Sequence, residues 1–112
     1  MSWKTPMVSG GILRIPQEIG TIEVGEVGSP MWYSWLAEAT HCSFHYSHLA
    51  GDFTARKERK QRGQHYWVAY RHANSKIYKA YLGKSEVLNE DLLVETSRIL
   101  ARAVEAHSHG GT

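Results

Sequence analysis

The sequence predicts an α+β fold, in which a three-stranded antiparallel sheet is packed by a C-terminal helix, with an additional N-terminal hairpin and a short tryptophan-rich helix. Apolar and polar side chains alternate with a period of two through much of residues 43–82, whereas residues 89–106 follow the helical period. The length of 112 residues supports one hydrophobic core, so a single domain is expected. A hydrophobic content of 42% is that of a globular chain and excludes long disorder.

The ends of the chain are expected to lie outside this domain. Residues 1–11 contain proline and two glycines and are predicted to form a flexible tail, as are the His- and Gly-rich residues 107–112. The domain then spans residues 12–106. Within it, residues 12–15 and 21–24 are short β-prone runs that are expected to pair as a hairpin.

The first helix is predicted from its start signal and its apolar stripe. Ser29 is a good N-cap, and Pro30 suits the first helical position, where its missing N–H is not needed. Apolar residues then recur at helical spacing, and the tryptophans among them are expected to be buried anchors. This stripe consists of Trp32, Trp35, Leu36 and Ala39.

Strands follow in the middle of the chain. The runs that alternate with a period of two are residues 43–47, 53–60, 65–71 and 76–82. The last three form the predicted sheet. Between the last two, residues 72–75 are expected to make a hairpin turn in which Asn74 takes a positive φ.

The C-terminal helix is predicted to begin after Asn89, which is a suitable N-cap. Glu90 and Asp91 place negative charge at the positive end of the helix dipole. Leu88 and Leu93 stand at the spacing of a hydrophobic staple. The predicted buried stripe consists of Leu92, Thr96, Ile99, Leu100 and Ala103.

The charge distribution is more informative than the net charge of +2. From Asp52 to Lys84 the chain carries nine basic residues and two acidic ones, whereas the remainder carries four basic and nine acidic. A basic middle between acidic flanks is typical of a protein that binds a polyanion. The alternative is a solvated basic surface without a partner.

Alternation predicts that the basic strands present a face for nucleic acid. Leu82 suits the side packed by the helix, so Lys79 and Tyr81 lie on the open side. Trp67 and Arg71 are expected to join them there, with Arg71 contacting a base edge and Lys79 a phosphate. Cations bind phosphates, rings contact sugars or bases, and a small sheet fits the major groove. The predicted nucleic-acid-binding residues are Arg56, Lys57, Arg59, Lys60, Arg62, His65, Trp67, Arg71, Lys76, Lys79, Tyr81 and Lys84.

Enzymatic activity is not expected, and no cofactor is predicted. Residues 83–85 read Gly-Lys-Ser, as at the end of a phosphate-binding loop, but Tyr78 stands where that loop needs its first glycine. The chain has neither a Gly-x-Ser-x-Gly elbow nor a Gly-x-Gly-x-x-Gly fingerprint.

A metal site is not predicted either. His41, Cys42, His45 and His48 are the one metal-like cluster, but on a strand they divide between two faces. No second cluster supplies the remaining ligands of a closed zinc site. Structural or phosphate-contacting histidines are therefore expected.

The sequence favours a cytoplasmic protein with no membrane partner. Cys42 is the single cysteine, so an intramolecular disulfide is impossible and a reducing compartment is expected. The N-terminus lacks the apolar run of a signal peptide, and no stretch is long and apolar enough to span a membrane.

Three segments together resemble a known module. Residues 51–59, 66–71 and 79–86 match the pattern Phe-Thr-x-Arg-x-Glu, Tyr-Trp-x-Ala-Tyr-Arg and Tyr-Leu-Gly-Lys-Ser, and residues 30–36 resemble its helix. This is the N-terminal module of large bacterial LuxR-type, MalT-like transcriptional regulators. The likeness covers roughly residues 27–102. The order of three strands and a helix is also similar, at the level of fold, to the arm-binding domains of tyrosine integrases, which read DNA with a sheet.

The chain departs from the regulators at two turns and in length. Ser75 and Asn89 replace the usual glycine and threonine, and both replacements preserve the geometry. The nucleotide-binding and helix-turn-helix domains that follow in the regulators are not in this sequence, so the resemblance does not imply their ATPase activity.

The expected function is non-catalytic binding of nucleic acid, most of all duplex DNA, by a small regulator or an accessory factor of a mobile element or defence system. The alternative is a protein-interaction module that docks an acidic partner or a second copy of itself. RNA or single-strand binding is the third possibility, because exposed aromatic side chains stack on unpaired bases.

Overall fold

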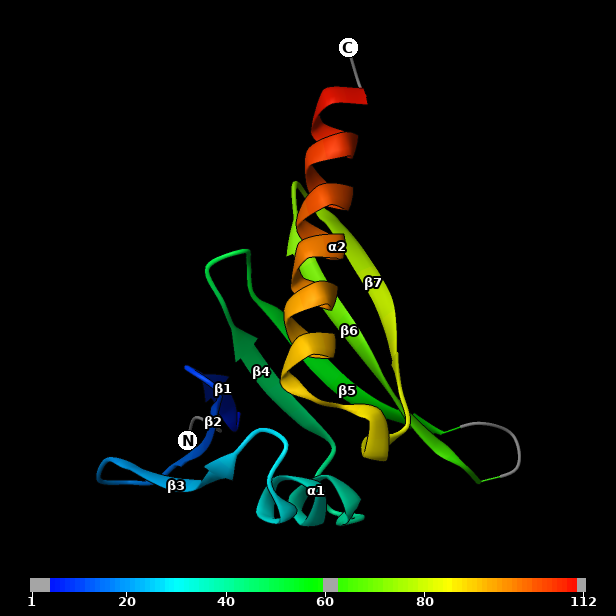
Figure 1. The fold of residues 1–112 in the computed structure, drawn as a ribbon. Coiled ribbons are helices and arrows are strands. Elements are labelled where there is room, and N and C mark those ends of the chain that lie inside the picture. Colours follow the sequence, from blue (N-terminus) through cyan, green and yellow to red (C-terminus); the bar gives the residue numbers. More distant parts are fainter. Residues whose placement is uncertain (1–4, 60–62, 111–112) are drawn as a thin grey trace.

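A mixed sheet of seven strands organises the part of the chain that the computed structural model describes, which is residues 5–59 and 63–110 (Figure 1). The strands are β1 (Met7–Ser9), β2 (Ile12–Pro16), β3 (Thr21–Glu26), β4 (Ser43–Ser47), β5 (Phe53–Arg59), β6 (His65–Ala73) and β7 (Lys76–Gly83). Their order is β3-β2-β1-β4-β5-β6-β7. The β1–β4 pair is parallel, and the other pairs are antiparallel.

The predicted three-stranded sheet is therefore too small. The β2–β3 hairpin forms as expected, but it joins the same sheet as β5–β7 through β1 and β4. Strand β1 lies in the segment that was expected to be a tail, and His45 N donates to the Pro6 carbonyl beside it at 2.8 Å. Three residues next to a Gly-Gly turn carry little local strand signal, and although β1 pairs with the adjacent β2, its pairing with β4 joins residues far apart in the chain.

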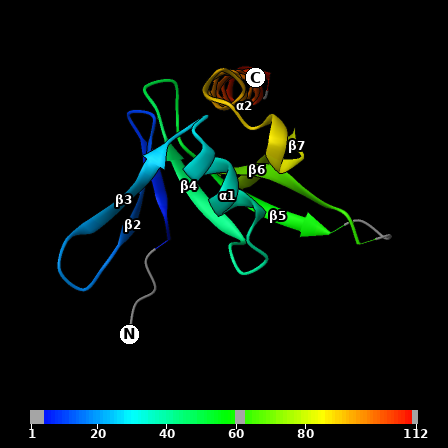
Figure 2. The same ribbon diagram turned by 60° about the horizontal axis from the view of Figure 1, so that its bottom comes forward.

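Helices α1 (Pro30–Ala37) and α2 (Glu90–Gly110) both lie on one face of the sheet (Figure 2). The predicted N-caps are confirmed: Ser29 Oγ accepts from Trp32 N at 3.3 Å, and Asn89 Oδ1 accepts from Leu92 N at 2.8 Å. A short 3₁₀ turn, η1 (Ser85–Val87), leads from β7 into α2. Helix α2 continues to Gly110, so residues 107–110, which were expected to belong to the C-terminal tail, are helical.

The core lies between the two helices and the sheet. The predicted anchors Trp32 and Trp35 are buried, and the Trp32 ring meets Phe44 of β4 edge-on with centroids 5.3 Å apart. Trp32 Nε1 donates to the Leu88 carbonyl at 2.7 Å, which joins α1 to the start of α2. Trp67 of β6 fills the space beyond Phe44, with ring centroids 5.2 Å apart.

The buried stripe of α2 differs in part from the predicted one. Thr96 and Leu100 are buried as expected, but Ile99 is 45% exposed and Ser97 is buried instead. The Ser97 hydroxyl donates to the carbonyl of Gly51 in the β4–β5 turn. A small hydroxyl side chain lets the helix approach this turn closely. Ala103 is exposed, whereas Ala101 and Val104 are partly buried, so the stripe is rotated relative to the predicted one.

The β6–β7 hairpin turns through two residues, so both strands are longer than predicted. Asn74 and Ser75 have φ angles of 53° and 63°, the left-handed conformation that a type I′ turn requires. Ala73 pairs with Lys76, and this register continues along the hairpin to a bulge at Trp67–Val68. In the described segments, no helix has the length and apolar character needed to cross a membrane.

Candidate nucleic-acid interface

The candidate interface is the side of β5–β7 opposite the helices. Because both helices pack on one face, the alternate side chains of these strands point away from both of them. The pairing register aligns these side chains across the strands: Thr54 with Tyr70, and Tyr70 with Lys79. We call this surface the open face. It consists of Thr54, Arg56, Glu58, Tyr66, Val68, Tyr70, His72, Ile77, Lys79 and Tyr81.

A carboxylate held by two tyrosines occupies the open face. Tyr66 Oη donates to Glu58 Oε1 at 3.4 Å, and Tyr70 Oη donates to Glu58 Oε2. The rings of Tyr66 and Tyr81 lie beside each other with centroids 5.6 Å apart. Burial and the negative charge of Glu58 raise the pKa of the Tyr66 hydroxyl, so the hydroxyl stays protonated and donates. Lys79 and Tyr81 complete a hollow of about 230 Å³ around this group.

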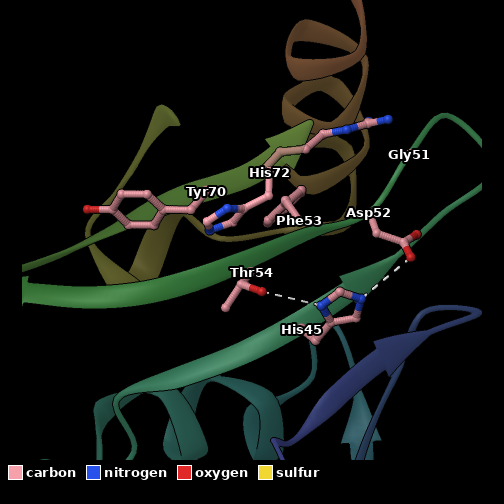
Figure 3. A pocket seen from close by; sticks show the side chains of 8 residues that line it. His45, Gly51, Asp52, Phe53, Thr54, Tyr70 and His72 are labelled. Atoms are coloured by element: carbon pink, nitrogen blue, oxygen red, sulfur yellow. Dashed lines mark hydrogen bonds and ion pairs between the residues drawn. The ribbon is translucent and has the colours of Figure 1, made fainter. Parts of the chain in front are cut away.

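A second hollow, of about 570 Å³, opens beside the first (Figure 3). His45 lies between two partners there: its Nδ1 is 3.4 Å from Thr54 Oγ1, and its Nε2 is 3.5 Å from Asp52 Oδ2. His72 and Tyr70 line the hollow from β6. Tyr70 borders both hollows, so polar groups lie on both sides of the Tyr70 ring on the open face.

Three predicted binding residues lie on the open face, namely Arg56, Lys79 and Tyr81. Arg56 and Lys79 are exposed, and Tyr81 is 60% exposed. Lys79 pairs with Tyr70 across the hairpin, and Arg56 pairs with Val68. Two cations therefore flank the tyrosine–glutamate group.

Three other predicted residues lie on the opposite side, which corrects the expected face of β6. Trp67 is fully buried, and its Nε1 donates to Ser85 Oγ at 2.9 Å. Arg71 packs against the β4–β5 turn, where a Cβ on Gly51 would stand 1.8 Å from its Nη1. Lys57 Nζ donates to the Leu36 and Glu38 carbonyls at 2.7 and 2.9 Å. Burial lowers the Lys57 pKa.

The reason for this correction is the parity of the hairpin. A turn with an even number of residues pairs odd-numbered residues of β7 with even-numbered residues of β6, so Lys79 and Tyr81 share a face with Tyr70 and Val68. Trp67 and Arg71 then face the helices. The same error of parity left Glu58, Tyr66 and Tyr70 out of the predicted binding residues. The even number of residues in the turn is the signal in the sequence that could have placed them on the open face.

The remaining predicted residues lie at the ends of the strands. Arg59 and His65 pair with each other and are exposed at one end of the strands, on the helix side with Lys57 and Trp67. Lys84 is exposed at the same end. Lys76 is exposed at the β6–β7 turn, where it pairs with Ala73. Lys84 and His65 also line a hollow of about 380 Å³ near the end of α1. Lys60 and Arg62 lie outside the described residues.

The histidines of the metal-like cluster engage separate partners. His41 Nδ1 is 2.7 Å from the Trp35 carbonyl, and its ring stacks on Trp35 with centroids 4.5 Å apart. His48 Nδ1 accepts from Ala50 N at 3.0 Å, whereas His45 lies on the other side of the sheet, beside Asp52. Cys42 is exposed. Among the described residues, no three potential ligands of a metal ion come together.

Comparison of the chain with protein-family models, curated proteins and solved structures gives no match.

Proposed function

We propose that this protein binds nucleic acid without catalysing a reaction, and that its ligand is duplex DNA held against the open face. The carrying observation is that both helices cover the same side of the sheet, which leaves Arg56, Lys79 and Tyr81 exposed and Tyr66 and Tyr70 half-buried opposite them. Cations bind phosphates, and planar side chains contact sugars and base edges.

The shape of this region supports a duplex. Strands β6 and β7 form a hairpin at the edge of the sheet, and the major groove of DNA admits a two-stranded ribbon. Exposed cations stand near both ends of the hairpin: Lys76 at the turn, and Lys84 at the other end, where Arg59 ends the neighbouring β5. With the hairpin in the groove, a cation would thus be available for phosphates at each end of the hairpin. The protein acts in the cytoplasm in this proposal, as a regulator or an accessory factor, since its single cysteine suits a reducing compartment.

A protein partner is the second candidate, because the edge strand carries exposed apolar side chains. Ile77 and Tyr81 of β7 are each 60% exposed, and an edge strand offers backbone groups for pairing with another strand. An acidic partner or a second copy of the chain would use these groups.

Fluorescence anisotropy across a salt series separates these candidates, with a labelled duplex, a single strand and an RNA as probes. If about four phosphates are neutralised, the log–log salt slope for the duplex is about −3.6, from about −0.9 per phosphate. Tighter binding of the single strand or the RNA would shift the proposal to unpaired bases.

The matched variants are Arg56→Ala and Lys79→Ala on the open face, with Arg98→Ala on the exposed side of α2 as control. Each open-face variant is expected to flatten the slope by about one unit, and the control is expected to leave it unchanged. Absence of binding to any nucleic acid at ~50 mM salt contradicts the proposal and leaves the protein partner as the better account.

A further inference from the structure

The open face contains a carboxylate where a surface for a polyanion would be expected to avoid one. Glu58 lies on β5 two residues from Arg56, on the same side of the sheet, and borders the hollow that Lys79 and Tyr81 line. A negative charge close to phosphates weakens binding, and the neighbouring cations offset this cost. A carboxylate at this place can accept hydrogen bonds from a ligand group that donates them.

Two hydroxyl groups hold the Glu58 carboxylate in a fixed orientation. Tyr66 donates to one oxygen and Tyr70 to the other, so the carboxylate is bound from two directions by side chains of the neighbouring strand. A carboxylate has about four acceptor positions, and these two bonds occupy about half of them. Glu58 thus retains acceptor capacity while its rotation is restricted.

We propose that Glu58 gives the protein its DNA sequence preference, by accepting a hydrogen bond from the exocyclic amino group of a cytosine in the major groove. This inference rests on the proposed function. Cytosine presents a donor there and no acceptor, whereas adenine presents an acceptor beside its amino group, guanine presents two acceptors, and thymine presents an acceptor and a methyl group. An oriented carboxylate therefore favours cytosine over the other three bases.

The test begins with a selection of preferred duplexes from a randomised pool by the full chain. Dissociation constants are then measured by anisotropy for the selected site and for duplexes in which each C·G pair is replaced in turn. Replacement of one cytosine is expected to weaken binding about tenfold or more, within the range of a good base contact.

Glu58→Gln is the decisive variant, because glutamine has the same shape and pairs with adenine through N6 and N7. It is expected to lose the preference for cytosine at that position and to favour adenine there. The control, Glu86→Gln, removes the same charge from the exposed surface of η1 and is expected to keep the cytosine preference.

A second variant keeps the test decisive if Glu58→Gln does not fold. Tyr70→Phe retains the ring and removes one of the hydroxyl groups that orient Glu58. It is expected to reduce the discrimination at the same position and to leave the salt slope unchanged.

The outcomes distinguish this inference from the proposed function. Duplex binding by the parent without a cytosine preference, or an unchanged preference in Glu58→Gln, overturns the role of Glu58 and leaves duplex binding intact. For a Glu58→Gln variant that fails to fold, unchanged discrimination in Tyr70→Phe overturns it in the same way. Failure of the parent to bind any duplex at ~50 mM salt overturns both.

Discussion

The two faces of β5–β7 are built from alternate residues of the same strands, yet their side chains have opposite roles. On the covered face, Trp67 is buried and Lys57 is bonded to the carbonyls at the end of α1. On the open face, Tyr70 is hydrogen-bonded to Glu58, and Lys79 is exposed beside them. Basic and aromatic residues occur on both faces, so composition does not identify the interface. The interface is identified by the position of each side chain relative to the helices.

The largest expected difference between the faces is in stability. Trp67→Ala opens a cavity in the core and is expected to lower the free energy of unfolding by about 3–5 kcal/mol. Tyr81→Ala, on the open face, is expected to cost less than about 1 kcal/mol because the side chain is already 60% exposed. Urea denaturation of the two variants measures both values. An equal loss of unfolding free energy in the two variants would mean that the Tyr81 side chain is packed as tightly as Trp67, which contradicts an open face.

The two faces also differ in how their tyrosines titrate. Burial and then the nearby Glu90 carboxylate raise the pKa of Tyr46, on the covered side of β4, from 10.0 to about 12. The unfolded chain therefore loses this proton at a lower pH than the folded protein. The stability due to Tyr46 is fully present below pH 10 and is lost as the pH rises through about 12, at about 1.4 kcal/mol per pKa unit.

Thermal unfolding from pH 9 upward tests this dependence. Tyr46→Phe is expected to remove most of the decline above pH 10, whereas Tyr66→Phe, on the open face, is expected to remove less because its side chain is only half-buried. An identical decline in the parent and in Tyr46→Phe would contradict the prediction.

The β4–β5 turn contacts α2, and a methyl group added at Gly51 of this turn is expected to disrupt the contact. Gly51 has a φ of +140°, and its carbonyl accepts from Ser97. Gly51→Ala is expected to destabilise the fold by about 1–3 kcal/mol, from strain at this φ and from the clash with Arg71. In Gly51→Ala/Arg71→Ala the clash is absent, so a double-mutant cycle by urea denaturation separates the two causes. Additive effects would exclude the clash.

The smallest expected effects separate two lysines, one from each face. Lys57→Ala removes two hydrogen bonds to α1 and is expected to cost about 1 kcal/mol of stability without changing the salt slope of DNA binding. Lys79→Ala is expected to flatten that slope by about one unit and to change stability by less than about 0.5 kcal/mol. Urea denaturation gives the stability change of each variant, and anisotropy across a salt series gives the salt slope of each. The reverse pattern would place the interface on the helix side.

Tertiary pairing decided what the sequence left open about the candidate site. Lys79 and Tyr81 were predicted on the open face and lie there, and Arg56, which was predicted to bind nucleic acid, lies there too. Trp67 and Arg71 were assigned to the wrong side, because alternation divides a strand into two sets and the register of the β6–β7 hairpin decides which set lies with Lys79. Burial of the large Trp67 ring between β4 and η1 resolves this choice.

By itself, the sequence determined the signals that act over a few residues. Ser29 and Asn89 start the helices, and Asn74 turns the hairpin, because these effects depend on local backbone hydrogen bonds and φ angles. The size of the sheet was decided only in the tertiary structure, where β1 pairs with β4 across more than thirty residues of chain. The shared side of the two helices was decided there too. Such choices depend on which distant surfaces bury the most apolar area together, and no short window of sequence contains that comparison.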